Sequence, residues 1–159
     1  MIGIISDTHE NEEAINKAVE IFKSKNVEFA VHCGDIISPP MLEHFQGLKM
    51  KFVFGNNDGE RNGLIARCKE MGFEEVTDEK TFIFKKKSFF VYHGTNKEKL
   101  DAEIKSNKYN YVLTCHTHIK RDEKIGKTRV INPGALFRIY PKTVALLDVE
   151  KDKVKFIKL

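Results

Sequence analysis

The sequence has no apolar run approaching the ~18 residues that a membrane-spanning helix needs. Its first residues, MIGIISDTHE, contain neither a basic segment nor a cleavage site of small residues, so they do not resemble a secretory signal peptide. The three cysteines show no Cys-x-x-Cys spacing, which argues against a disulfide framework. We therefore predict a cytoplasmic protein that does not contact a membrane.

The sequence also lacks a basic stripe interleaved with aromatic residues, so it predicts no dedicated nucleic-acid surface. The net charge is +4, and the lysine run at 85–87 is typical of a hairpin turn between two apolar segments. No linker, repeat or low-complexity segment divides the chain. A length of 159 residues with 41% hydrophobic residues predicts a single domain over 1–159.

Short apolar runs alternate with segments of helical spacing in the first half of the chain, which predicts an α/β fold with parallel strands and helical crossovers. The second half, after a hairpin and a helix at 96–106, is rich in strands and predicts a mostly antiparallel meander. If each half supplies a sheet, the result is a sandwich of two mixed β-sheets flanked by helices. Strands are expected in the first half at 2–6, 29–33 and 51–54, and helices at 10–25, 39–45 and 61–72.

Side chains that can bind metals follow five of the predicted strands, at the point where each strand ends. They are Asp7, His9, Asp35, Asn56, His93, His116 and His118. Because ligands of parallel α/β sheets bind beyond the carboxyl ends of the strands, we expect these side chains to cluster there. An ionised group buried without a partner is costly, and divalent metal ions are the usual compensation.

One zinc-like ion takes about four ligands, and seven candidate ligands are too many for it. This number favours two ions with a shared ligand. Asp35, with two carboxylate oxygens, is the expected bridge. The spacing of His116 and His118 makes both point the same way on an extended chain, so that each can serve a different ion. The predicted sets are Asp7, His9, Asp35 and His118 for one ion, and Asp35, Asn56, His93 and His116 for the other.

Such a centre favours chemistry on phosphate esters. Two divalent ions, two aspartates and a bridging hydroxide leave a net charge of about +1, and ions ~3.5–4 Å apart stabilise the oxygens of an in-line displacement. The mixed donors suit transition metals: we expect manganese, with nickel, iron, cobalt or zinc as alternatives. Phosphoryl oxygens are the natural substrate ligands of such a centre, and the two ions lower the pKa of a water that bridges them.

In their order along the chain, these motifs resemble those of the calcineurin-like metallophosphoesterases. The matching segments are Asp7-Thr8-His9, Gly34-Asp35, Gly55-Asn56-Asn57-Asp58, His93-Gly94, His116-Thr117-His118 and the Asn-Pro-Gly at 132–134, which is similar to that of the small prokaryotic phosphodiesterases. The resemblance implies a four-layer α/β/β/α sandwich, a metal-dependent phosphodiesterase and the ligand sets given above. It also implies a small phosphodiester substrate and allows a homo-oligomer.

Two positions depart from the family pattern. Asn57 stands where the family has a histidine, and an amide can donate a hydrogen bond but cannot act as a general acid. We interpret Asn57 and Asp58 as catalytic, with a structural role for Asp58 as the alternative, and expect diesters with good leaving groups as substrates. Cys115 stands where the family has glycine, and we expect it to pack rather than to bind metal.

Two further residues are candidates for substrate binding. Asn11 follows the Asp-Thr-His motif, and its alternative role is that of a residue at a helix N-terminus. Arg61 follows the Gly-Asn-Asn-Asp motif, and its alternative role is that of a solvated residue at the start of a helix. Two other functions stay open: a catalytically weak protein-binding scaffold of the same fold, which the intact donors argue against, and a nuclease. DNA-repair members of the family carry an extra capping domain, for which this chain has no room.

Overall fold

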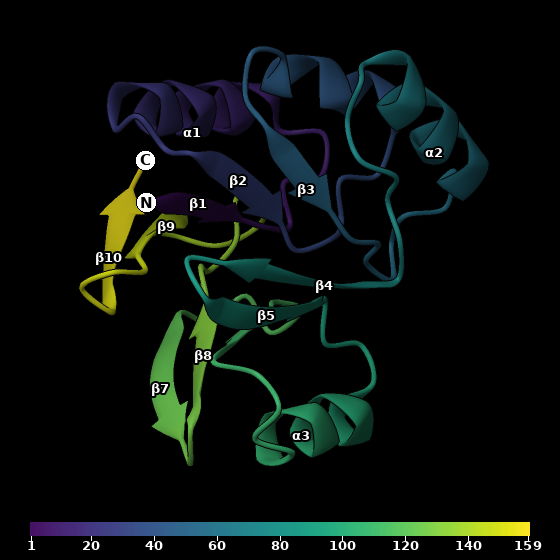
Figure 1. Ribbon diagram of the computed structural model, residues 1–159. Helices are drawn as coiled ribbons and strands as arrows, with labels where there is room; N and C mark the ends of the chain where they lie inside the picture. The colour runs from purple at the N-terminus through teal and green to yellow at the C-terminus, as the bar shows by residue number, and fades with distance from the viewer.

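The computed structural model describes residues 1–159, and in it two five-stranded sheets pack face to face between helices (Figure 1). Figure 1 shows α1 and α2 over the outer face of one sheet and α3 over the outer face of the other. The predicted sandwich of two mixed sheets with flanking helices is confirmed. No helix combines the length and the apolar character that crossing a bilayer requires.

The first sheet has the strand order β10-β9-β1-β2-β3, with β1, β2 and β3 parallel to one another and β9 antiparallel to β1. Its strands are β1 (Ile2–Ile5), β2 (Phe29–His32), β3 (Met50–Phe52), β9 (Thr143–Asp148) and β10 (Lys153–Lys158). The expectation that each half of the chain supplies a sheet is therefore wrong. The last two strands return to the first sheet, where apolar β9 becomes a buried neighbour of β1.

The second sheet has the order β4-β5-β6-β8-β7, and its central strands β5, β6 and β8 are parallel. Its strands are β4 (Glu79–Phe84), β5 (Lys87–Tyr92), β6 (Tyr111–Leu113), β7 (Arg121–Ile125) and β8 (Thr128–Asn132). The predicted antiparallel meander is wrong for these central strands. Helix α3 (Lys97–Lys105) lies between β5 and β6 in the chain and provides the crossover that a parallel pair needs.

The other helices cover the first sheet. Helix α1 (Glu12–Ser24) begins after Asn11, whose Oδ1 accepts a hydrogen bond from the backbone N–H of Ala14. Its buried face is Ala14, Ile15, Ala18, Val19 and Phe22, at the spacing predicted from the sequence. The segment η1 (Pro39–Phe45) is a 3-10 helix, and α2 spans Arg61–Glu70.

The buried apolar side chains fill the three spaces between the four layers. The largest cluster lies between the helices and the first sheet, the second between the two sheets, and the smallest between the second sheet and α3. Cys33 and Cys115 belong to the cluster between the sheets, and all three cysteines are free. The parallel strands of both sheets thereby end at one shared edge, where the loops that carry the candidate site meet.

Candidate metal centre

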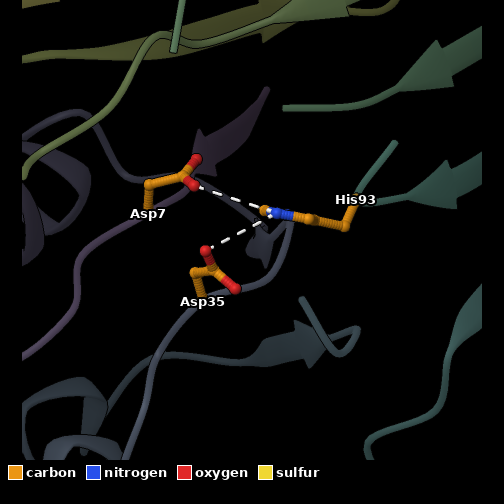
Figure 2. Close-up of side chains that lie close together, drawn as sticks. All are labelled: Asp7, Asp35 and His93. Atoms are coloured by element: carbon orange, nitrogen blue, oxygen red, sulfur yellow. Dashed lines mark ion pairs between the residues drawn. The ribbon is translucent and has the colours of Figure 1, made fainter. Parts of the chain in front are cut away.

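A buried triad forms the floor of the site. Asp7, Asp35 and His93 follow β1, β2 and β5, and their side chains point toward one another (Figure 2). Nε2 of His93 lies 3.9 Å from Oδ1 of Asp7 and 3.6 Å from Oδ2 of Asp35. None of the three is more than 1% exposed. Three groups with charge or lone pairs therefore share a space closed to solvent.

The remaining four candidates surround this triad. Nε2 of His118 lies 3.0 Å from Oδ1 of Asp7, and Nε2 of His9 lies 3.8 Å from Oδ2 of Asp35. Oδ1 of Asn56 lies 3.1 Å from Nε2 of His93 and 2.9 Å from Nδ1 of His116. The structure thus brings all seven together. Their contacts form one group around Asp7 and His118 and another around Asn56 and His116.

The chain adopts an unusual backbone conformation at five of these seven residues. Asp7, His9, Asp35, His116 and His118 have φ angles of 45°, 46°, 61°, 61° and 59°. Left-handed backbone is costly for a residue with a side chain, at about 1–3 kcal/mol each, and clusters at functional sites. The expectation of an extended chain at His116 and His118 is wrong, since tight loop turns rather than strand alternation aim the two imidazoles.

The electrostatics of the triad call for a cation. Nδ1 of His93 lies 2.8 Å from the carbonyl oxygen of Cys33 and donates to it, so Nε2 is the ring nitrogen that faces the two carboxylates. Oδ1 of Asp7 is buried and accepts no hydrogen bond, although His118 lies beside it. Two carboxylates buried side by side, one with an oxygen that has no donor, are costly without a cation. A divalent ion between them satisfies all of them, so the residues present fit a metal centre.

The backbones of the loops approach so closely that two positions exclude any side chain. Gly34 has φ +104°, and a Cβ there would lie 2.6 Å from Nδ1 of His93. A Cβ at Gly55 would overlap Oδ1 of Asp35. Glycine at these two positions lets the loops after β2 and β3 press against the triad.

Asn57 and Asp58 hold the loop that carries Asp35. The backbone N–H of Asn57 donates to Oδ1 of Asp35 at 2.9 Å, and its side-chain amide donates to Oδ2 at 2.6 Å. Asp58 accepts from the backbone N–H groups of Asp35, Gly55 and Ile37. Burial raises the pKa of Asp58 against the opposing effect of these bonds. Asp58 has a visible structural role, and its catalytic role stays a prediction.

Sequence reasoning missed two residues that support the site. Cys115 donates its thiol to Oδ2 of Asp7, which Ser6 also contacts at 2.8 Å, so its role goes beyond the expected packing. Burial, followed by the charge of Asp7, raises the pKa of this thiol, which stays protonated as a donor. Asn132, at the end of β8, donates to the carbonyl of Cys115 and to Thr117 on either side of His116. The Asn-Pro-Gly motif was the available signal for Asn132.

Two histidines near the loops have lowered pKa values. Burial lowers the pKa of His9 although Asp35 and Asp7 raise it, which favours the neutral imidazole that binds metals. Burial lowers the pKa of His32 to about 3. Its Nδ1 accepts from the backbone N–H of Gly34 at 3.2 Å, so its Nε2 donates to Thr8 at 3.0 Å. His32 thereby joins the first and second loops.

The two predicted substrate contacts have other partners in this structure. Asn11 caps α1, and its Nδ2 donates to the carbonyl of Leu136 at 3.0 Å. Arg61 pairs with Asp78 at 2.6 Å, and its guanidinium lies 4.5 Å from the centre of the Phe54 ring. These contacts fit the alternative roles at helix starts, and substrate binding by Asn11 and Arg61 stays a prediction.

Comparisons with known proteins agree with this geometry. A family model described as the calcineurin-like phosphoesterase superfamily domain matches residues 1–152. Phosphodiesterase MJ0936 of Methanocaldococcus jannaschii is 37% identical over 163 positions, covering 99% of this chain and 98% of that protein. The solved structure of an archaeal phosphodiesterase has a TM-score of 0.94 at 36% identity and covers 99% of both chains. Yfce, a phosphoesterase from E. coli, covers 99% of this chain and 98% of its own with a TM-score of 0.74; at 18% identity it shows the shared fold alone.

Proposed function

This chain belongs to the calcineurin-like phosphoesterase superfamily, and on that premise we propose that it is a phosphodiesterase that hydrolyses small phosphate diesters with two divalent transition-metal ions. The observation that carries the proposal is the buried cluster of Asp7, Asp35 and His93, with an oxygen of Asp7 that has no hydrogen-bond donor. Manganese is the expected ion, with nickel, iron, cobalt and zinc as alternatives.

The two groups of donors support a division of ligands between two ions. His9 and His118 contact the carboxylates of Asp35 and Asp7, whereas Asn56 contacts His93 and His116. Asp35, which contacts donors of both groups, is the proposed bridge. When bound, such ions lower the pKa of a water between them and neutralise charge on a phosphoryl group.

The chain's own residues have three proposed roles in the reaction. The buried floor keeps the carboxylates in a medium of low dielectric constant, which strengthens their interaction with cations. Asn56, Asn57 and His116 form an exposed rim at which a substrate can arrive. The Asn57 amide donates a hydrogen bond to the substrate but no proton, so the proposed substrates are diesters whose leaving groups need little protonation.

Three further points belong to this proposal. We propose that residues 1–159 act as one domain and that the substrate is small or has an exposed phosphodiester. The location in the cytoplasm and a homo-oligomeric state stay predictions from the sequence and the family resemblance.

The test is hydrolysis of bis(4-nitrophenyl) phosphate by purified protein with added manganese or nickel. We expect metal-dependent release of 4-nitrophenol. Asp35→Asn should lower kcat/KM by about 100-fold or more, because even residues that only support metal ligands contribute about 10–100-fold. Asp101→Asn, the same change on α3 in an exposed pair with Lys97, is the matched control and should keep the wild-type rate.

Normal turnover by Asp35→Asn would contradict the metal mechanism. Absence of turnover on any ester, with both metals supplied, would favour a non-catalytic scaffold of the same fold. Degradation of single-stranded DNA at catalytic enzyme concentration would favour a nuclease instead.

A further inference from the structure

An open hollow of about 380 Å³ adjoins the candidate metal centre. His9 belongs to both, and the other residues that line the hollow are Glu10, Asn11, Ile37 and Phe137. A volume of this size lies within the range of about 300–1,000 Å³ that is typical of small-molecule sites. A substrate whose phosphorus lies at the metals can therefore extend one of its groups directly into this space.

One wall of the hollow is the ring of Phe137. It stacks on the imidazole of His9, with ring centres 4.0 Å apart and planes at 20°. The preceding residue, Leu136, donates its backbone N–H to the carbonyl of Asp7 at 3.2 Å and accepts from Asn11 at 3.0 Å. These two bonds fix the position of Phe137 relative to the loop that carries Asp7 and His9.

A second apolar residue of the lining is Ile37, which adopts φ +81°. Left-handed backbone is a genuine outlier for a β-branched residue, and glycine or asparagine would adopt it at lower cost. The conformation is held by a hydrogen bond of 2.7 Å from the Ile37 N–H to Oδ1 of Asp58. The side chain of Ile37 stays partly exposed toward the hollow. An apolar, partly exposed side chain on a strained backbone points to a contact that the side chain makes with a ligand.

The charges of the lining disfavour the phosphate itself in the hollow. No lysine or arginine side chain lines it, although the guanidinium of Arg138 lies 4.8 Å from the centre of the Phe137 ring. The one carboxylate of the lining, Glu10, accepts a hydrogen bond from Ser38 at 2.9 Å. An anionic phosphoryl group is attracted to the metals and repelled by Glu10. The walls of Ile37 and Phe137 instead suit an uncharged, flat and apolar group.

We propose that the hollow lined by Ile37 and Phe137 binds one ester group of the phosphodiester substrate, and that it selects a flat ring, either an aryl group or a nucleobase. This inference rests on the proposed function, since it takes the reacting phosphorus to lie at the metal centre. It makes Ile37 and Phe137 determinants of specificity rather than of chemistry.

The test compares diesters that share 4-nitrophenol as leaving group and differ in the second ester group: methyl, phenyl or thymidin-5'-yl. We expect wild-type kcat/KM to be about 10-fold or more higher for the phenyl than for the methyl ester, as apolar pockets discriminate on this scale. An equal preference for the thymidinyl ester identifies a nucleobase as an occupant, and a preference confined to phenyl identifies an aryl group. Equal kcat/KM for all three esters would overturn the proposal.

Two variants of Ile37 test the wall itself. In Ile37→Asn, the asparagine suits the left-handed backbone and keeps the N–H that donates to Asp58, but the apolar surface is lost. The ratio of kcat/KM for the phenyl ester to kcat/KM for the methyl ester should therefore fall to below about 3-fold. Ile37→Val keeps a β-branched apolar side chain and should keep most of the ratio. The matched control is Ile83→Asn on β4, where the isoleucine is 79% exposed, and it should leave the ratio unchanged.

A second measurement separates failure of this inference from failure of the proposed function. Phenylphosphonate and methylphosphonate share a headgroup and are titrated calorimetrically into manganese-loaded wild-type and Ile37→Asn protein. We expect tighter binding of phenylphosphonate to wild-type protein only. If no diester is hydrolysed, the proposed function fails and this titration decides the subsite alone. If diesters are hydrolysed and Ile37→Asn leaves both the ratio and the binding difference unchanged, the subsite is wrong.

Discussion

Asn57 stands where the resemblance to the calcineurin-like metallophosphoesterases implies a histidine, and this difference has a chemical consequence. Its backbone and side-chain amides both donate to Asp35, at 2.9 Å and 2.6 Å. An amide at this position can orient a carboxylate or contact an oxygen of the substrate, but it cannot transfer a proton. The proposed limit on leaving groups therefore depends on the identity of this one side chain.

Asn57→His tests that limit with a series of substituted aryl diesters graded by the basicity of their leaving groups. Because general-acid catalysis contributes typically about 10²–10⁴-fold, the variant should hydrolyse the most basic leaving groups at least about 10-fold faster than the wild-type protein. The dependence of log kcat on the leaving-group pKa should become shallower. Asn57→Gln keeps the amide and should keep the wild-type slope; an unchanged slope in Asn57→His as well would contradict this account.

The buried side chain of His32 should make the stability of the folded protein depend on pH. Its ring is fully buried and bonded to Thr8 and Gly34, and burial lowers its pKa from 6.5 to about 3. The unfolded chain therefore binds a proton below about pH 6.5 that the folded chain does not take up until about pH 3. The free energy of unfolding should be undiminished above pH 6.5 and should decrease as the pH falls, by up to about 1.4 kcal/mol per unit.

Urea unfolding of metal-free protein at several pH values between 7 and 4 measures this dependence. The glutamine of His32→Gln cannot titrate, so the free energy of unfolding of this variant should decrease less steeply with falling pH. The difference in slope between the variant and the wild-type protein should be at most about 1.4 kcal/mol per pH unit, the value for one proton. Parallel pH dependences for the variant and the wild-type protein would show that His32 is not buried in its neutral form.

At the scale of elements, the N-terminus of α1 links the helix to the site. Asn11 caps the helix through Oδ1 and holds the loop before Phe137 through Nδ2. Asn11→Ala removes both bonds and should lower the free energy of unfolding by about 1–2 kcal/mol, the usual range for a lost cap. Urea denaturation provides the measurement.

Asn11→Ser separates the two bonds, because serine keeps the capping acceptor and loses the donor to Leu136. It should recover most of the stability that Asn11→Ala loses. Equal stability of Asn11→Ala and the wild-type protein would contradict the capping role.

The elements also show how far the sequence alone could lead. Apolar runs followed by Asp, Asn or His identified the loops after β1, β2, β3, β5 and β6, because burial and polarity change sharply at a strand end. The sheet to which β9 belongs could not be predicted, since an apolar strand such as Thr143–Asp148 suits the centre of either sheet. Cys115 and Asp7 are 108 positions apart, so their contact leaves no local pattern.

The left-handed backbone of the site loops could not be predicted from the sequence either. Histidine adopts positive φ more often than most residues with a side chain, but no local pattern in the sequence predicts it at His116 and His118. Sequence reasoning named side chains that the structure brings together, but it predicted an extended backbone at His116 and His118 that the structure contradicts. Ile37 and Phe137 were missed for a related reason, because an isolated apolar residue in a loop is usually unremarkable in sequence.

At the scale of the whole molecule, the two sheets cooperate to build the site. Asp7, Asp35 and Asn56 follow strands of the first sheet, and His93, His116 and His118 follow strands of the second. The apolar cluster between the sheets, which contains Cys33 and Cys115, holds the two sets of loops together. Neither sheet alone carries a complete set of donors for the proposed pair of ions.

Anomalous diffraction from crystals grown with excess manganese tests the central claim most directly. Two peaks of similar height should appear ~3.5–4 Å apart. One should lie among Asp7, His9 and His118, the other among Asn56, His93 and His116, with Asp35 between them. A single peak, or manganese bound away from these side chains at saturating concentration, would contradict the account.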